Sequence, residues 1–319
     1  MTPMGAPRSI ARHAPAGVPR LVVRRSREVL DAERDQRPIV ALESSVLAQG
    51  LPVPANREAA GRMTDAVRAA GAEPAITAVV RGVPTLGLAT DELERFLARQ
   101  GVMKVSARDL AWAMTTGADG ATTVAAALCL AVLADVQVFA TGGIGGVHRQ
   151  APFDESADLL ELARSPVIVV CAGAKAILDL AATHERLETL GVSVVGFRTD
   201  EFPGFFTAQT GLGVRATADT PTEIAALFRA ERSLERPGAL LVVQPPPAAV
   251  ALDAGVVSNA IDVALDAAAR AGASGAALTP FLLAAVERAT GGASLVANLA
   301  LLEANASLAG EIAVALLRS

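Results

Sequence analysis

A single lysine, Lys175, stands where the sequence could carry covalent chemistry. It follows an apolar run at residues 166–171, typical of a buried strand, and the small residues Ala172-Gly173-Ala174. Burying an ammonium group is costly, apolar surroundings favour the neutral amine, and a neutral amine is a nucleophile. The pattern indicates a lysine that forms a Schiff base. The alternative is a strand-to-helix turn, with Lys175 in the first helical turn and its side chain in water.

A carboxylate, Glu43, holds the equivalent place after another strand candidate at residues 38–42. It is either a buried general acid or a surface residue at a strand end. In open α/β sheets, ligands bind beyond the carboxyl ends of the strands. The polar residues that follow the strand candidates are therefore the first candidates for a site.

A glycine-rich segment at residues 141–149 follows a third strand candidate and ends in His148 and Arg149. Its glycine spacing is not that of a dinucleotide-binding loop, and no helix follows at once. Four glycines let backbone N–H groups approach an anion, and His148 and Arg149 would add positive charge beside a phosphate. The alternative is a flexible loop.

Two further segments have both a binding and a structural interpretation. The oxygen-rich run Asp154-Glu155-Ser156-Ala157-Asp158 suits a hard cation such as Mg²⁺ or Mn²⁺, or it is the acidic start of a helix. Residues 120–123 are expected to open an apolar helix. Their N–H groups and hydroxyls would hold a phosphate or only cap that helix.

The elements expected around these residues alternate between strands and helices. The strand candidates are continuous apolar runs, as in parallel strands covered on both faces, and comprise residues 38–42, 75–80, 136–140, 166–171, 192–196 and 239–243. Helix starts are indicated at Ser106, Thr220 and Thr279. We expect one three-layer α/β/α domain with a mostly parallel central sheet over residues 21–319, after a disordered tail at residues 1–20.

Composition narrows the possible partners. The 319 residues are 52% hydrophobic and carry a net charge of −5 without a basic stripe, which argues against a nucleic-acid partner. Cys129 and Cys171 lie in apolar runs, as in a reduced compartment, and the sequence has no Cys/His metal cluster. The longest apolar stretch, residues 124–134, is too short for a membrane span. The N-terminus lacks the apolar region of a secretory signal. These features favour a cytoplasmic protein without a membrane partner.

The order of the motifs resembles the pseudouridine-5′-phosphate glycosidase family, also called indigoidine synthase A-like. The resemblance runs from about residue 36 to the C-terminus and is densest in the glycine-rich segment and in Cys171-Ala-Gly-Ala-Lys175. The motifs that carry it are residues 41–45, 50–52, 54–56, 104–110, 120–126, 139–148, 156–159, 170–175, 199–203, 279–283, and 291–295 with Asn298.

The resemblance implies a reaction and a role for each matching residue. Family members break or form the C–C bond between C1′ of ribose 5-phosphate and C5 of uracil. Lys175 matches the nucleophile that forms an imine at C1′, and Glu43 matches the proton donor. The remaining matches are Lys104, Val124, Ser156, Ala157, Asp158 and Asn298 at the substrate, with His148 in the glycine-rich motif, and Asp154 at one Mn²⁺ per subunit. The family fold is one α/β/α domain, assembled as a homotrimer.

Two departures from the family pattern bear on the acceptor. Gln49 stands where histidine is usual before Gly50-Leu51-Pro52, and Gln244 begins a segment that usually starts with asparagine. We expect both near the acceptor, because the residues that would handle the sugar are kept; the alternative is neutral drift at these positions. The competing hypotheses are the pseudouridine reaction, C-ribosylation of an aromatic polyketide with ribose 5-phosphate, and a non-catalytic sugar-phosphate binder. Retention of Lys175 and Glu43 argues against the last.

Overall fold

The strand candidates form one sheet in the computed structural model, which describes residues 21–149, 153–272 and 278–318. The predicted tail at residues 1–20 lies outside these ranges. The strands are β1 (Arg24–Arg25), β2 (Ile39–Leu42), β3 (Glu73–Val80), β4 (Val83–Leu86), β5 (Val102–Val105), β6 (Asp119–Thr122), β7 (Val138–Ala140), β8 (Ile168–Cys171), β9 (Ser193–Phe197), β10 (Ala216–Ala218) and β11 (Leu240–Val243).

The sheet is mostly parallel, as the sequence predicts. Its strand order is β1-β4-β3-β2-β7-β8-β11-β9-β10, with β6 paired to β3 and β5. Only the pairs of β3 with β4 and with β6 are antiparallel among the described strands. The central strands β2, β7, β8 and β11 are parallel neighbours with buried residues on both faces, which is why their sequences are continuously apolar.

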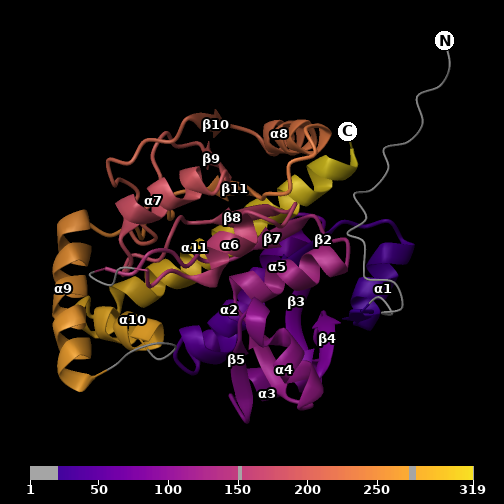
Figure 1. Cartoon of the computed structure of the whole chain (residues 1–319), viewed down its shortest axis with the longest axis horizontal. Coiled ribbons are helices and arrows are strands. Elements are labelled where there is room, and N and C mark those ends of the chain that lie inside the picture. Colours follow the sequence, from indigo (N-terminus) through magenta and orange to yellow (C-terminus); the bar gives the residue numbers. More distant parts are fainter. Residues whose placement is uncertain (1–20, 150–152, 273–277, 319) are drawn as a thin grey trace.

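Helices cover both faces of this sheet (Figure 1). They are α1 (Arg27–Arg34), α2 (Ala55–Ala69), α3 (Thr90–Leu97), α4 (Leu110–Thr115), α5 (Val124–Leu133), α6 (Ala157–Leu162), α7 (Leu180–Thr189), α8 (Pro221–Ser233), α9 (Ala254–Ala271), α10 (Leu278–Ala289) and α11 (Ala293–Leu317), with a π-helix at Val46–Gly50 and a 3₁₀ turn at Ala107–Asp109. Helix α11 packs with α2 and α8 on one side, and α5 packs with α6 on the other. The α/β/α prediction is confirmed.

Two of the three predicted capping residues are found where helices begin, whereas the third, Thr279, is already the second residue of α10. Thr220 caps α8 and forms a reciprocal capping box with Glu223. Ser106 and Asp109 form a similar box at the 3₁₀ turn that leads into α4. In both cases a side chain satisfies a backbone N–H that the helix itself leaves without a partner.

Helix α11 corrects the sequence-based estimate of the longest apolar segment. Its 25 residues exceed the stretch at residues 124–134, and by length and composition it is the one described helix that could cross a membrane. Within its apolar 18-residue window, 56% of the residues are buried inside the protein. Helix α11 also packs against β2, β7 and β8, so its apolarity is that of a core helix.

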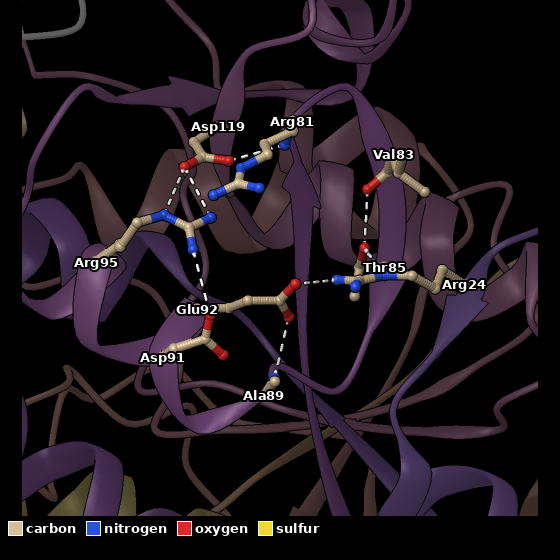
Figure 2. A network of polar contacts seen from close by, with 9 residues as sticks. All are labelled: Arg24, Arg81, Val83, Thr85, Ala89, Asp91, Glu92, Arg95 and Asp119. Carbon is tan, nitrogen blue, oxygen red and sulfur yellow. Dashed lines mark hydrogen bonds and ion pairs between the residues drawn. The ribbon is translucent and has the colours of Figure 1, made fainter.

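A smaller lobe extends from the far half of β3 and contains β4, β5, β6, α3 and α4 (Figure 1). On its surface, a network of ion pairs joins β1, α3 and β6 (Figure 2). Arg24 Nη2 lies 2.7 Å from Glu92 Oε1, and Arg95 Nη2 lies 3.1 Å from Asp119 Oδ2. The backbone N–H of Ala89 donates to the other oxygen of Glu92 at 3.0 Å. The two ion pairs fix α3 onto β1 and β6.

Candidate active site

The carboxyl ends of the central strands bring the predicted chemical groups to one edge of the sheet. Glu43 follows β2, Thr141 follows β7, Gln244 follows β11, and the segment with Lys175 follows β8. Because these four strands are parallel neighbours, their ends lie side by side. The edge is therefore assembled from segments that are about 200 residues apart in the chain.

Lys175 lies in a loop between β8 and α7 and not in a helical turn. Its backbone N–H donates to the carbonyl of Ile144 at 3.0 Å, and its side-chain Nζ donates to the carbonyl of Gly143 at 2.7 Å. Helix α7 begins only at Leu180, and the lysine is half-buried. The alternative of a lysine in the first helical turn is therefore wrong.

The lysine loop is held by close backbone packing against the segment that contains Phe205. A Cβ on Gly173, whose φ is +78°, would lie 2.0 Å from the carbonyl oxygen of Pro203. The N–H of Phe205 donates to the carbonyl of Ala172 at 3.0 Å. Phe205 is buried with a φ of +66°, and a Cβ on Gly143 would lie 2.6 Å from its ring. Glycine at 143 and 173 thus permits the approach that fixes the carbonyl on which Lys175 rests.

Glu43 is buried, so its surface alternative is wrong. Its side chain is 4% exposed. Thr141 Oγ1 donates to Oε1 at 2.6 Å, and Ser45 Oγ donates to Oε2 at 2.8 Å. Hydroxyl groups rotate and can either donate or accept, so both contacts survive whether or not the carboxyl group carries a proton. This environment suits a group that gives and retakes a proton.

A buried asparagine, Asn305, connects this edge to helix α11. Its Nδ2 donates to the carbonyls of Thr141 at 2.8 Å and Gly142 at 3.2 Å. Its Oδ1 accepts from Gln244 Nε2 at 2.8 Å. Gln244 therefore supports the strand ends. This contact does not bear on the expectation that Gln244 lies near the acceptor, which stays a prediction. Asn305 was missed at the sequence level, although an asparagine within an apolar helix was the available signal.

Lys104 completes a group of four neighbouring charges. Burial lowers its pKa from the ordinary value, and the positive charge of Lys175 lowers it further, whereas Glu43 and Asp158 raise it. No ion pair joins these four side chains within the described part of the chain. Lys104 and Lys175 are the only lysines in the sequence. Two unpaired ammonium groups in one place favour an anionic ligand.

Asp158 connects the glycine-rich segment to helix α5. Its Oδ1 accepts from the N–H of Ala125 at 2.9 Å, and its Oδ2 accepts from the N–H of Gly145 at 2.8 Å. Ser156 caps α6 and accepts from the N–H of Asp158 at 3.2 Å. With both carboxylate oxygens engaged, Asp158 positions the loops that surround the site. Val124, at the start of α5, is buried beside this junction.

The prediction that residues 120–123 open a helix is wrong for the first three of them. Residues 120–122 belong to strand β6, and only Thr123 holds the N-cap position of α5, without a side-chain capping hydrogen bond. A Cβ on Gly120 would lie 2.5 Å from Val105 Cγ2, so the glycine serves the close pairing of β5 and β6. The hydroxyl of Thr123 is buried without a hydrogen-bond partner among the described residues. The cap position therefore leaves a polar atom for a ligand or water.

The remaining predicted residues within and just after the glycine-rich segment are His148, Arg149, Asp154 and Ala157. The backbone N–H of His148 donates to the carbonyl of Asp154 at 2.9 Å, and the side chains of Asp154 and Ala157 are exposed. Arg149 turns inward, and its Nε donates to the carbonyl of Leu178 at 3.1 Å. Arg149 therefore braces the lysine loop, and its place beside a phosphate stays a prediction.

The described residues do not build a complete metal cage. They contain no group of three or more His, Cys, Asp or Glu side chains that could hold an ion. Glu155 is paired with Arg186 at 2.9 Å, and Asp158 is occupied by backbone N–H groups. Of the carboxylates of Asp154, Glu155 and Asp158, only that of Asp154 has no partner among the described residues, which fits a hard ion that keeps water or substrate oxygens as its other ligands.

Cys171, at the end of β8, is excluded as a competing nucleophile. Burial raises the pKa of its thiol to about 12. The thiolate is the reactive form of cysteine, so this side chain is inert at neutral pH. Lys175, four residues further on, is therefore the candidate nucleophile after this strand.

An open cavity of about 230 Å³ lies between the segment after the π-helix and helices α10 and α11, and none of the strand-end residues named above lines it. Its wall is formed by Gln49, Gly50, Leu51, Pro52, Arg99, Phe206, Leu283, Ala284, Glu287, Ser294, Leu295 and Asn298. The oxygens Gln49 Oε1 and Asn298 Oδ1 are buried and have no partner in the described residues. Each of these two wall residues thus holds an oxygen that neither the described residues nor the open cavity satisfies.

The fold and this site define an α/β/α protein with a lysine and an acid at the strand ends, and comparison with known proteins identifies the family. The protein family described as "Indigoidine synthase A like protein" matches residues 28–315 of this chain. The chain belongs to this family.

Relatives cover almost its whole length. It is 67% identical over 278 residues to a pseudouridine-5′-phosphate glycosidase of Gemmatimonas aurantiaca, covering 87% of this chain and 91% of that protein. A protein of the same name from Herpetosiphon aurantiacus is 50% identical over 294 residues, covering 92% and 97%.

Solved structures share the fold. The prealnumycin C-glycosynthase AlnA, in complex with ribulose 5-phosphate, superposes with a TM-score of 0.85 at 38% identity, covering 93% of this chain and 98% of that one. An indigoidine synthase A-like protein from Thermotoga maritima gives a TM-score of 0.85 at 33% identity, covering 95% and 99%.

Proposed function

We propose that the protein breaks or forms the C–C bond between C1′ of ribose 5-phosphate and C5 of uracil, with pseudouridine 5′-phosphate as the bonded form. The observation that carries the proposal is the placement of Lys175 and Glu43 at the ends of β8 and β2, on either side of β7. The relatives named pseudouridine-5′-phosphate glycosidase support it. A binder without catalysis would gain nothing from an amine beside a buried acid.

Cleavage begins with two coupled events at C1′. The amine of Lys175 attacks C1′, the bond from C1′ to the ring oxygen breaks, and that oxygen takes a proton from Glu43. The adduct nitrogen then returns a proton to Glu43. The product is an open-chain sugar joined to Lys175 through a secondary amine, still bonded to uracil.

The C–C bond breaks in the second stage. The electron pair of the lysine nitrogen forms a C=N bond as uracil C5 leaves C1′ and takes the proton from Glu43. Water then hydrolyses the imine, releasing ribose 5-phosphate and free Lys175, which restores the proton to Glu43. The sum is pseudouridine 5′-phosphate plus water giving uracil plus ribose 5-phosphate. The reverse sequence forms the bond.

The surrounding residues supply binding and positioning. The ammonium group of Lys104 would bind the substrate phosphate, since it is half-buried and lacks an ion-pair partner in the described structure. Asp154 would hold a Mn²⁺ ion together with water and phosphate oxygens, and the ion would neutralise phosphate charge. Ser156, Ala157 and His148 would line the sugar-phosphate side, and Asn298 the side of the base.

Assembly and location form a further part of the proposal. We infer a homotrimer in the cytoplasm, in line with the family resemblance. Light scattering coupled to size-exclusion chromatography measures the assembly. A mass three times that of the chain supports the trimer, and a monomer contradicts it.

A second candidate acceptor is an aromatic polyketide. The structural similarity to AlnA, described as a C-glycosynthase, favours it. The higher identity to proteins named pseudouridine-5′-phosphate glycosidase favours uracil.

The test is direct turnover of pseudouridine 5′-phosphate with Mn²⁺ present. We expect release of equal amounts of uracil and ribose 5-phosphate, and formation of pseudouridine 5′-phosphate from the two products, measured by mass spectrometry. If neither direction proceeds while ribose 5-phosphate still binds, uracil is not the acceptor.

A further inference from the structure

We propose that three buried hydroxyl groups, those of Ser44, Thr77 and Thr122, position Glu43 relative to the groups that bind the substrate phosphate. We call these three side chains the hydroxyl cluster. The inference rests on the proposed function, and it gives a role in aligning the acid to residues that touch no substrate. Its basis is the complete burial of the cluster and the hydrogen bonds that connect it to both sides of the site.

The hydroxyl cluster lies where strand β3 exchanges one partner for another. Strand β3 pairs with β2 as far as Ile76 and with β6 from Ala78, so Thr77 lies between the two pairings. Ser44 lies two residues beyond the end of β2, and Thr122 is the last residue of β6. At such a junction the backbone ladder is interrupted, and its buried polar groups need other partners.

The three hydroxyls supply those partners. Ser44 Oγ and Thr122 Oγ1 both donate to the carbonyl of Thr77, at 2.7 and 2.8 Å. Thr77 Oγ1 donates to the carbonyl of Leu42 at 2.9 Å. Each hydroxyl carries one proton, so every proton of the cluster has a partner inside the protein. All three residues are 0% exposed, and the cluster therefore acts through position and not by binding substrate.

A reciprocal pair of contacts joins the acid side of the site to the phosphate side. The N–H of Thr122 donates to Ser44 Oγ at 2.9 Å, and the N–H of Ser44 donates to Thr122 Oγ1 at 3.4 Å. Glu43 directly precedes Ser44. Thr123, whose buried hydroxyl has no partner among the described residues, directly follows Thr122. The pair therefore sets where the acid lies relative to the start of helix α5.

Strand β5 extends this connection to Lys104. In the parallel pairing of β5 with β6, Val105 lies opposite Thr122, and Lys104 is the residue before Val105. The N–H of Thr123 donates to the carbonyl of Val105 at 2.9 Å. The hydroxyl cluster thus connects Glu43 to both groups that we expect at the phosphate, which are Lys104 and the N-cap of α5.

A fixed distance between the acid and the phosphate site matters because the phosphate is remote from the bond that breaks. The phosphate lies on C5′, whereas the acid acts on the ring oxygen and on the base. Binding energy from a remote group speeds a reaction only when the protein holds the reacting groups in a fixed place relative to it. A misplacement of about 1 Å costs on the order of 10²-fold in rate. Loosening the cluster should therefore lower kcat while the phosphate contacts remain.

The experiment measures kcat for cleavage of pseudouridine 5′-phosphate and the inhibition constant of inorganic phosphate. Thr122→Val removes one hydroxyl and keeps the shape of the side chain, and Ser44→Ala removes another. We expect either change to lower kcat about 10- to 100-fold and to leave the inhibition constant of phosphate unchanged. Thr122→Ser keeps the hydroxyl and should restore most of kcat.

The matched control is Thr85→Val, the same substitution at another threonine of the small lobe that is 0% exposed (Figure 2). Thr85 Oγ1 donates to the carbonyl of Val83 at 2.8 Å and accepts from Arg24 Nε at 3.2 Å. Its removal should lower the melting temperature, because buried partners lose a hydrogen bond, but it should leave kcat unchanged. The comparison separates alignment of the acid from stability of the fold.

Unchanged kcat in both Thr122→Val and Ser44→Ala would overturn the inference. So would a loss of kcat matched by an equal rise in the inhibition constant of phosphate, because the cluster would then only build the phosphate site. A third result requires no variant to fold. Equal kcat/KM for pseudouridine and pseudouridine 5′-phosphate in the unmodified protein would show that the phosphate aligns nothing. Absence of pseudouridine 5′-phosphate cleavage by the unmodified protein would instead overturn the proposed function.

Discussion

Two buried carboxylates, Glu92 in the small lobe and Glu43 at the strand ends, have opposite surroundings. Both oxygens of Glu92 face firm donors, the guanidinium of Arg24 and the N–H of Ala89 (Figure 2). Both oxygens of Glu43 face rotatable hydroxyls, and no cation lies within ion-pair distance in the described structure. The first arrangement holds its carboxylate between a cation and a fixed N–H, whereas the partners of the second can exchange donor and acceptor roles.

The same contrast extends to the cations. In the small lobe, Arg24 and Arg95 are each paired with a carboxylate. At the strand ends, Lys104 and Lys175 repel each other and have no ion-pair partner in the described residues. A network that satisfies its own charges serves the fold, and one that leaves them unsatisfied has free energy available for a ligand.

The largest expected effect of breaking this contrast comes from Glu43→Gln. The amide keeps the size of the side chain but cannot transfer a proton, so we expect kcat to fall about 10²- to 10⁴-fold. Steady-state turnover of pseudouridine 5′-phosphate measures the effect, and the melting temperature controls for folding. Activity within threefold of the unmodified protein would remove Glu43 from proton transfer.

Lys104→Met should separate binding from stability. Losing the charged contact to phosphate should raise KM about 10- to 100-fold. Because the folded-state pKa of Lys104 is lowered, its positive charge costs stability at neutral pH, and that cost disappears as pH rises from the lowered pKa toward the unfolded value of roughly 10.4.

Lys104→Met should therefore unfold at a higher temperature than the unmodified protein at pH 7, and by a smaller margin at high pH. Thermal unfolding without ligand measures the margin at each pH. A variant that is less stable at pH 7 and binds phosphate normally would show that Lys104 is structural.

Chelation tests the metal at Asp154. We expect EDTA to lower turnover at least about tenfold, the loss typical of removing even an outer contact of a metal site, and Mn²⁺ to restore it. Asp154→Ala should not be restored by Mn²⁺, whereas its exposed neighbour Glu155→Ala should be. Full activity in chelator would exclude the ion from the reaction.

The smallest effect on turnover is expected from the paired network. Glu92→Gln leaves Arg24 without its carboxylate and should cost about 1–3 kcal/mol of unfolding free energy with kcat unchanged. Asp91→Asn is the matched control, since Asp91 is exposed and lies 4.0 Å from Arg95, a contact worth about 0–1 kcal/mol. Chemical denaturation measures both. A loss of kcat in Glu92→Gln without a loss of stability would contradict the view that this network serves only the fold.

The central strands and the residues after them could be predicted from sequence because parallel strands buried on both faces are continuously apolar. The same rule failed in the small lobe. Asp119-Gly120-Ala121-Thr122 has little strand character, and its pairing with β3 and β5 decides its conformation. Position alone predicted neither the burial of Glu43 nor the half-buried lysine loop.

The supporting residues of the site could not be predicted in the same way. Asn305 acts through its place on a helix that crosses the ends of β7 and β8, and Gln244 acts through Asn305. These roles depend on tertiary contacts between segments more than 60 residues apart. Gln49 was singled out from its departure from the family pattern, but the direction of its amide required the contact to Val102.

Reductive trapping of the imine tests the central claim most directly. The protein is incubated with ribose 5-phosphate and borohydride, digested, and analysed by mass spectrometry. The chain contains only two lysines, Lys104 and Lys175, so the site of attachment is read without ambiguity. The account predicts a reduced sugar phosphate on Lys175, absent from Lys175→Ala, which should fold and lose turnover. An adduct on Lys104 alone, no adduct at all, or an active Lys175→Ala variant would contradict it.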